Sequence, residues 1–388
     1  MDGDSSLALR MTRNYAIGMS NADFLYNLWY VAAAGGQVAV GKTLAKTVLG
    51  QQLLLGRDSR GEVFALRDFC PHRGVPLRYG TFDGETIECC YHGWCFNTAG
   101  QCTKIPTLLP DDPTDISRIK TQSFPCREVN GAIWVYIPAP KTRAPEVLPE
   151  IPAPLPNPPP QIGGRGDADV PSPASQGRVR EGVYYHVDSV MFPCDMDHAV
   201  IGLMDPSHGP FVHASWWWRS KRSMHAKQKH FAPRGLGFAM VRHTPSKNSR
   251  AYKILGGQPS TEIAFQLPGL RTEHISIGER HIVLLTALTP VDGERTELHQ
   301  FMYTNIGFLN LLKPFLRPFG KKFIQQDLEI VKKQQDGLVG DHPGLLLIGD
   351  ADQQALWYYK LKKDYLESQA NGLAFVNRVP EKTLRWQS

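Results

Sequence analysis

The chain has 388 residues, of which 42% are hydrophobic and 21% charged, and 43 basic against 37 acidic residues give a net charge of +6. This composition is that of a globular protein and excludes a disordered or fibrous chain. Since domains commonly run roughly 100 to 200 residues, the length predicts two domains.

The N-terminus and the cysteines bear on the compartment. The first residues, Met-Asp-Gly-Asp-Ser-Ser, lack the basic start and apolar core of a signal peptide, and no apolar run approaches the ~20 residues of a membrane span. Four of seven cysteines crowd into residues 89–102, unlike a disulfide framework. We expect a cytoplasmic protein with no membrane anchor. The densest basic cluster, residues 219–229, is too short to predict nucleic-acid binding and indicates a solvated surface or a docking patch for an acidic protein.

The first part of the chain shows short β-rich runs separated by Gly and Asp, which predict an all-β domain over residues 25–138. The predicted strands are 47–49, 52–55, 63–66, 87–91 and 132–137. Ten prolines then fall within residues 138–160, where neither a helix nor an interior strand can form. The segment 139–160 is therefore predicted to be an extended linker.

The remaining residues, 161–388, mix both kinds of element and predict an α+β domain, an antiparallel sheet flanked by helices. The predicted strands are 182–187, 282–289 and 300–305, and the predicted helices are 195–204, 311–335 and 352–368. The fold class of the whole chain is therefore α+β.

Two Cys-His pairs form the first candidate site. Cys70 and His72 lie in Cys-Pro-His-Arg-Gly, and Cys89 and His92 follow in Cys-Cys-Tyr-His-Gly. Two hairpin tips at this spacing can bring two thiolates and two imidazoles together, and the glycine after each pair allows a tight turn. Zinc takes such a set of two cysteines and two histidines, but zinc modules usually pair like with like. A [2Fe-2S] centre of the Rieske type needs one Cys and one His from each loop, and we favour it. Cys90 is out of register and is predicted to be a packed thiol.

A second candidate site lies in Asp-Pro-Ser-His-Gly-Pro-Phe-Val-His, residues 205–213. On a regular helix His208 and His213 would point roughly 140° apart. We therefore expect the helix to break between them at Gly209-Pro210. Two imidazoles and one carboxylate are the ligand set of non-haem Fe(II) sites that activate O2.

Asp327 is the candidate for the carboxylate. On a helix its neighbours in phase are Phe323, Ile324, Ile330 and Val331, so it is predicted to lie in the middle of a buried stripe. A lone buried carboxylate is costly, and a metal would compensate it. The alternative is a buried Asp that caps another element or pairs with arginine.

Both motifs resemble those of the Rieske non-haem iron oxygenases, the aromatic-ring-hydroxylating family that includes the vanillate and dicamba O-demethylases. Respiratory-type Rieske proteins carry an extra cysteine in each loop, where this chain has Val75 and Tyr91. The resemblance implies that Asp205 is no ligand but a bridge between an iron-ligating histidine, His208, and a Rieske histidine of the neighbouring subunit, by position His92. The family often has an Asn shortly before this Asp, at Ile201 or Gly202 here.

The resemblance also implies a head-to-tail homotrimer of the α3 type, with a Rieske [2Fe-2S] cluster and a mononuclear Fe(II) in each chain. The chain has no dinucleotide or flavin fingerprint, so an NAD(P)H-dependent reductase, with or without a ferredoxin, would supply electrons. We expect monooxygenation, as hydroxylation or oxidative demethylation, of an aromatic or polycyclic small molecule. The alternatives are cis-dihydroxylation of an aromatic ring, a Rieske electron carrier without active mononuclear iron, and a zinc-stabilised binding module.

Overall fold

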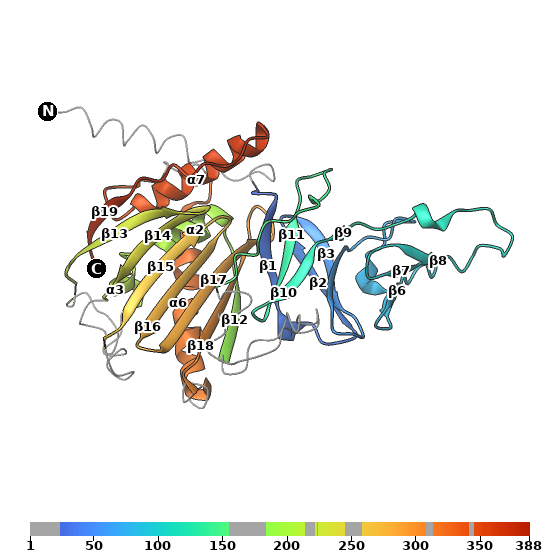
Figure 1. Ribbon diagram of the computed structural model, residues 1–388, viewed down its shortest axis with the longest axis horizontal. Helices are drawn as coiled ribbons and strands as arrows, with labels where there is room; N and C mark the ends of the chain where they lie inside the picture. Colours follow the sequence, from blue (N-terminus) through green and yellow to red (C-terminus); the bar gives the residue numbers. More distant parts are fainter. Residues whose placement is uncertain are drawn as a thin grey trace, which may run out of the picture. The chain divides into compact units, whose positions relative to one another are not determined.

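The computed structural model describes residues 24–154, 184–213, 222, 224–244, 258–307, 313–340 and 345–388 (Figure 1). The chain divides into two compact units, one of Tyr26–Arg180 and one of Met1–Leu25 with Glu181–Ser388. In the described part of the chain no helix has the length and apolarity that crossing a membrane requires.

Three antiparallel sheets build the unit of Tyr26–Arg180. The strands β1 (Leu28–Ala34) and β11 (Ala132–Ile137) are buried along their whole length and pair in the order β1-β11-β10, which explains their continuous apolar sequences. A second sheet has the order β2-β3-β4-β9 and a third the order β5-β6-β7-β8. Their strands are β2 (Lys42–Val48), β3 (Gln51–Arg57), β4 (Val63–Arg67), β5 (Thr81–Phe82), β6 (Thr86–Glu88), β7 (Cys95–Asn97), β8 (Cys102–Lys104), β9 (Ser123–Phe124) and β10 (Cys126–Val129).

One eight-stranded antiparallel sheet forms the frame of the other unit, in the order β12-β18-β17-β16-β15-β14-β13-β19 (Figure 1). Its centre is regular, and β17 pairs with β18 residue for residue from Ile282 with Thr304 to Pro290 with Thr296. The strands are β12 (Tyr184–Phe192), β13 (Ala226–Arg234), β14 (Gly237–His243), β15 (Ser260–Gln266), β16 (Leu270–Ile277), β17 (Arg280–Pro290), β18 (Thr296–Thr304) and β19 (Lys382–Gln387).

Helices pack on this sheet. In α7 (Gln353–Ala370) the ring of Trp357 lies 5.1 Å from that of Phe238 on β14, centroid to centroid. α2 (Met196–Met204) approaches the sheet so closely that a Cβ on Gly269 would lie 2.2 Å from the Met196 side chain. Two further α-helices lie in the described part of this unit, α3 (Gly209–Val212) and α6 (Lys313–Gly337). This packing fixes the segments that carry the candidate metal ligands.

The α+β fold class is confirmed, and every predicted element overlaps an observed helix or strand. Residues 139–154, the described part of the predicted linker, contain neither helix nor strand. The prediction missed the strands β13–β16 and β19, together with β1, β5 and β7–β10. In β13, Ala-Lys-Gln-Lys-His-Phe-Ala-Pro-Arg, only Phe231 is buried, so almost no apolar periodicity was available.

Candidate metal sites

Two loops with the same backbone hydrogen bonds present the first candidate site. In each loop the N–H four residues after the cysteine donates to the cysteine carbonyl, from Gly74 to Cys70 at 2.9 Å and from Gly93 to Cys89 at 3.0 Å. The cysteine N–H donates to the carbonyl five residues on, at 2.9 Å in both loops. Gly74 and Gly93 have φ of +76° and +68°, a conformation that favours glycine. The loops are therefore equivalent supports for the two Cys-His pairs.

The four predicted side chains line one pocket, together with Arg73, Val75, Tyr91 and Trp94. Both cysteines are buried, and the imidazole centroids of His72 and His92 are 4.5 Å apart. His72 stacks on Trp94, with 4.5 Å between ring centroids and an interplanar angle of 3°. Two sulfur and two nitrogen ligands are thus available along the lining of one pocket.

The donor set fits a Rieske cluster. Nδ1 of His92 is buried and has no hydrogen-bond partner among the described residues, which is costly unless a metal takes its lone pair. Burial, followed by the neighbouring Cys89, raises the pKa of Cys70 to about 11. The thiol therefore holds its proton at neutral pH unless bound iron displaces it. Cys90 is exposed, so the prediction of a packed thiol was wrong.

The second candidate site lies at the ends of the short helix α3. His208 precedes the helix and His213 follows it, and their Nε2 atoms are 3.2 Å apart. Asp327 on α6 places its Oδ1 3.1 Å from Nε2 of His213 and 3.8 Å from Nε2 of His208. The three predicted ligands thus offer ligand atoms that all lie within 4.8 Å of one another.

The hydrogen bonds of His208 show why this cluster suits a cation. Nδ1 of His208 lies 2.8 Å from the carbonyl oxygen of Asp205, which can only accept, so Nδ1 carries the proton and Nε2 of the neutral ring has a free lone pair. That lone pair points toward the carboxylate of Asp327. Burial alone would lower the pKa of His208, but Asp205 and the charge of Asp327 outweigh it and raise the pKa, so protons compete with a metal here.

Two details of the second site differ from the prediction. The predicted helix break at Gly209-Pro210 was wrong, because these two residues begin α3. The preceding helix, α2, has already ended at Met204. The histidines converge because α3 has only four residues and His213, at ψ 25°, has already left the helical conformation. The second difference concerns α6. Ile330 is 44% exposed, and the Asp327 side chain is 38% exposed, so Asp327 lies at the edge of the buried stripe of Ile324, Leu328 and Val331.

Asp205 stands next to this site without being part of it. It ends α2, and its Oδ2 is 3.6 Å from Nδ1 of His208. The Asp205 side chain is 36% exposed, which leaves it accessible to a further partner.

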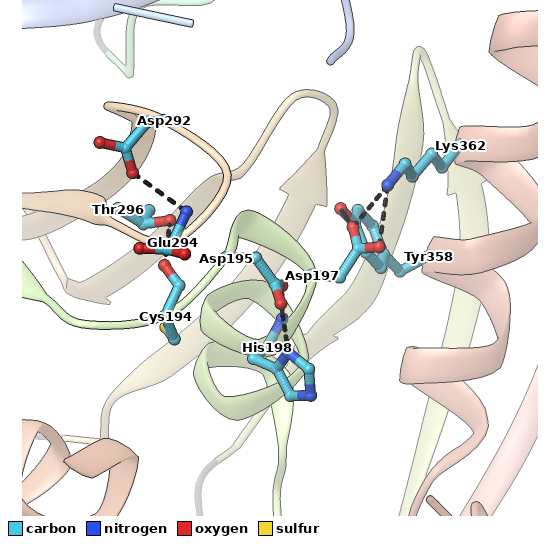
Figure 2. Close-up of polar contacts among 9 residues, drawn as sticks. All are labelled: Cys194, Asp195, Asp197, His198, Asp292, Glu294, Thr296, Tyr358 and Lys362. Atoms are coloured by element: carbon cyan, nitrogen blue, oxygen red, sulfur yellow. Dashed lines mark hydrogen bonds and ion pairs between the residues drawn. The ribbon is translucent and has the colours of Figure 1, made fainter. Parts of the chain in front are cut away.

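A separate polar cluster secures α2 at its start (Figure 2). Asp195 caps the helix, and its Oδ2 lies 2.7 Å from Nδ1 of His198. Asp197 accepts hydrogen bonds from Tyr358 at 2.5 Å and from Lys362 at 2.8 Å, both on α7. No sequence pattern signals this contact, because it joins residues more than 160 positions apart.

Sequence motifs and fold together define a class of protein: a two-centre metalloprotein that joins a cluster-binding β domain to a domain with a metal site of two histidines and one carboxylate. Two family models match the chain, the Rieske [2Fe-2S] domain over residues 28–125 and the vanillate O-demethylase oxygenase C-terminal domain over residues 196–359. The chain therefore belongs to the Rieske oxygenases, as an alpha subunit with the [2Fe-2S] cluster of its Rieske domain and a mononuclear iron site.

Curated relatives agree with this assignment. The 4beta-methylsterol monooxygenase of Methylococcus capsulatus is 35% identical over 136 residues, 35% of this chain and 36% of that protein. The oxygenase component of dicamba O-demethylase from Stenotrophomonas maltophilia is 33% identical over 190 residues, 49% of this chain and 48% of that protein. The matches to this 4beta-methylsterol monooxygenase, to a chlorophyllide a oxygenase of Chlamydomonas reinhardtii and to a toluene-4-sulfonate monooxygenase subunit of Comamonas testosteroni cover 36%, 28% and 34% of those proteins, about a third of their length.

Solved structures share the fold. Dicamba monooxygenase bound to dicamba matches with a TM-score of 0.66 at 20% identity, over 90% of this chain and 99% of that one. NdmA of Pseudomonas putida CBB5 with caffeine matches with a TM-score of 0.66 at 18% identity, over 90% and 94% of the two chains.

Proposed function

We propose that this chain is the terminal oxygenase component of a multicomponent system that oxidises an aromatic or polycyclic small molecule with O2. Electrons would come from an NAD(P)H-dependent reductase, directly or through a ferredoxin. The observation that carries the proposal is the convergence of His208, His213 and Asp327 in one chain with a Rieske domain. An iron held by these three ligands supplies O2 activation, and the cluster held by the two Cys-His pairs supplies single electrons.

The chain's own residues set up this chemistry. Asp205 keeps the proton of His208 on Nδ1, which leaves Nε2 free for the metal. The ring of Phe323 covers His213, with 4.6 Å between ring centroids, and His213 is 8% exposed, so water is kept from this ligand. An iron held by only these three protein ligands would be able to bind O2 beside a substrate.

The role of Asp205 depends on assembly. We propose that three chains form a head-to-tail ring in which Asp205 links His208 to a Rieske histidine of the neighbouring subunit, by position His92. The carboxylate of Asp205, about a third exposed and 3.6 Å from Nδ1 of His208, supports this role. Asp205→Ala should therefore keep both metals and the trimer but uncouple electron transfer from product formation. Normal coupling in this variant would contradict the bridge.

Monooxygenation is the reaction that we favour. Relatives named as monooxygenase or demethylase include the 4beta-methylsterol monooxygenase, the dicamba O-demethylase and a toluene-4-sulfonate monooxygenase subunit. The second candidate is cis-dihydroxylation, because a 3-chlorobenzoate-3,4-dioxygenase subunit is 35% identical over 114 residues. Turnover of an aromatic panel under labelled O2 separates them by mass spectrometry. One labelled oxygen, or a methyl group released as formaldehyde, supports monooxygenation, and two labelled oxygens support dihydroxylation.

Metal analysis tests the oxygenase itself. Purified protein should be red-brown with about three irons per chain, two in the cluster and one at the second site. His208→Ala should lose only the mononuclear iron, and the absorbance of the cluster serves as the control. A colourless, zinc-loaded protein would refute the proposal. A protein with the cluster but no iron bound through His208 would instead be an electron carrier.

A further inference from the structure

Gln326 on α6 contacts one of the candidate iron ligands from behind. Its Oε1 lies 3.2 Å from Nδ1 of His213, although the two residues are 113 positions apart in the sequence. Gln326 is the direct neighbour of the third ligand, Asp327, on the same helix. The contact belongs neither to the ligand set nor to the bridge that we assign to Asp205.

α6 therefore surrounds His213 on three sides. Asp327 faces Nε2 at 3.1 Å, Gln326 faces Nδ1 at 3.2 Å, and the ring of Phe323 packs on the imidazole at an interplanar angle of 33°. By contrast, His208 is oriented by its own loop, through the carbonyl oxygen of Asp205. The two histidines are thus positioned by independent means.

The chemistry of an amide oxygen decides what this contact does. An amide oxygen only accepts, so Nδ1 of His213 must donate to it, and Nε2 is left as the unprotonated nitrogen that faces Asp327. The other tautomer would carry a proton on Nε2 and could not bind a metal through it. A hydrogen bond to the outer nitrogen of a ligating histidine also fixes the plane of its ring.

We propose that Gln326 is a positioning residue that holds His213 in its metal-binding tautomer and orientation. The proposal rests on the function proposed above, since it takes His208, His213 and Asp327 as the iron site. α6 then contributes twice to the metal centre, once as a ligand through Asp327 and once through the support of His213.

The test measures Fe(II) affinity by chelator competition in the full-length protein with its Rieske cluster in place. Gln326→Leu removes the acceptor at similar volume and should weaken Fe(II) binding about 10- to 100-fold. Gln326→Asn keeps the amide but shortens its reach, and should show a similar loss. Gln326→Glu restores an acceptor and should bind Fe(II) at least as tightly as the wild type.

Gln325→Leu is the matched control. Gln325 lies on the same helix, and its side chain donates a hydrogen bond to the exposed Glu329. It should bind Fe(II) as the wild type does, and an unchanged calorimetric transition of the unit that contains α6 shows that each variant is folded. Wild-type affinity in Gln326→Leu and Gln326→Asn, with loss of binding in His208→Ala, would overturn the role of Gln326 alone. Equal loss in Gln326→Glu would also overturn it. If His208→Ala binds Fe(II) as well as the wild type, the proposed iron site itself fails.

Discussion

Replacing Lys362 with methionine should destabilise the unit that contains the eight-stranded sheet. The Lys362 side chain is 9% exposed, and its Nζ lies 2.8 Å from each carboxylate oxygen of Asp197 (Figure 2). Tyr358 donates a third hydrogen bond to this carboxylate. Burial, followed by the charge of Asp197, raises the pKa of Tyr358 well above its ordinary value, so it remains a donor. The cluster joins α2 to α7, and α2 leads into the segment of His208 and His213.

The magnitude follows from the charge that would be left behind. Removal of one partner from a buried ion pair costs about 3–5 kcal/mol, because the other charge loses its compensation. Tyr358 still bonds to Asp197, whose side chain is 14% exposed, so the lower end of this range applies, about 3 kcal/mol. At roughly 2–4 °C per kcal/mol for a unit of this size, Lys362→Met should lower the melting temperature by about 6–12 °C. The double variant Asp197→Leu/Lys362→Met should recover much of this loss, because no buried charge remains.

Calorimetry measures these transitions, while cluster absorbance follows the Rieske domain separately and should not shift. Lys363→Met is the matched control on the same helix. Lys363 is 62% exposed and 3.8 Å from Glu367, so its loss should cost less than about 1 kcal/mol. An unchanged melting temperature in Lys362→Met, or a double variant as unstable as the single one, would refute this reasoning.

Three further predictions concern single residues. Gly93→Ala should cost the Rieske domain about 1–2 kcal/mol in urea unfolding, because φ is +68°, whereas Gly36→Ala, with open space around it, should cost less. Cys89→Ser should abolish the visible absorbance of the cluster, whereas Cys90→Ser should leave it intact because Cys90 is exposed. The reverse result would make Cys90 the ligand in place of Cys89. Burial alone would lower the pKa of His198, but Asp195 outweighs burial and raises the pKa. The interaction of protonated His198 with Asp195 therefore stabilises the folded protein fully below pH ~6.5, and this stabilisation is lost as the pH rises through the folded-state pKa. His198→Asn should therefore cost more unfolding free energy near pH ~6 than near pH ~9, and an equal cost at both would contradict this assignment.

The candidate ligands were predictable for two reasons. The two Cys-His pairs and the two histidines of the second site lie close together in the sequence, and Asp327 shares a helical face with apolar residues. Cys70 and His72 are two residues apart. Each of the two ligand loops is closed by a hydrogen bond from the cysteine N–H to the carbonyl oxygen five residues later. The strand Ala132–Ile137 and the helices α2, α6 and α7 were predictable because long apolar or periodic sequences encode them.

What the sequence could not reveal depends on long-range packing. Ile330 shares the helical phase of Asp327 and is nevertheless 44% exposed, because the phase of a helix does not show how far its neighbours extend over it. β13 and β16 contain many charged and polar residues, and they form strands because neighbouring strands satisfy their backbone groups. Gln326 carries no motif, and its role depends on a residue 113 positions away.

The separation of the ligands along the chain also bears on the order of assembly. The Rieske residues fall between 70 and 92, so their site can form as soon as two neighbouring loops have been synthesised. His213 and Asp327 enclose the strands β13 to β18 between them, and closing so long a loop requires most of the sheet to be in place. During synthesis the cluster site is thus complete well before the iron site, and iron at the second site reports that the sheet has closed.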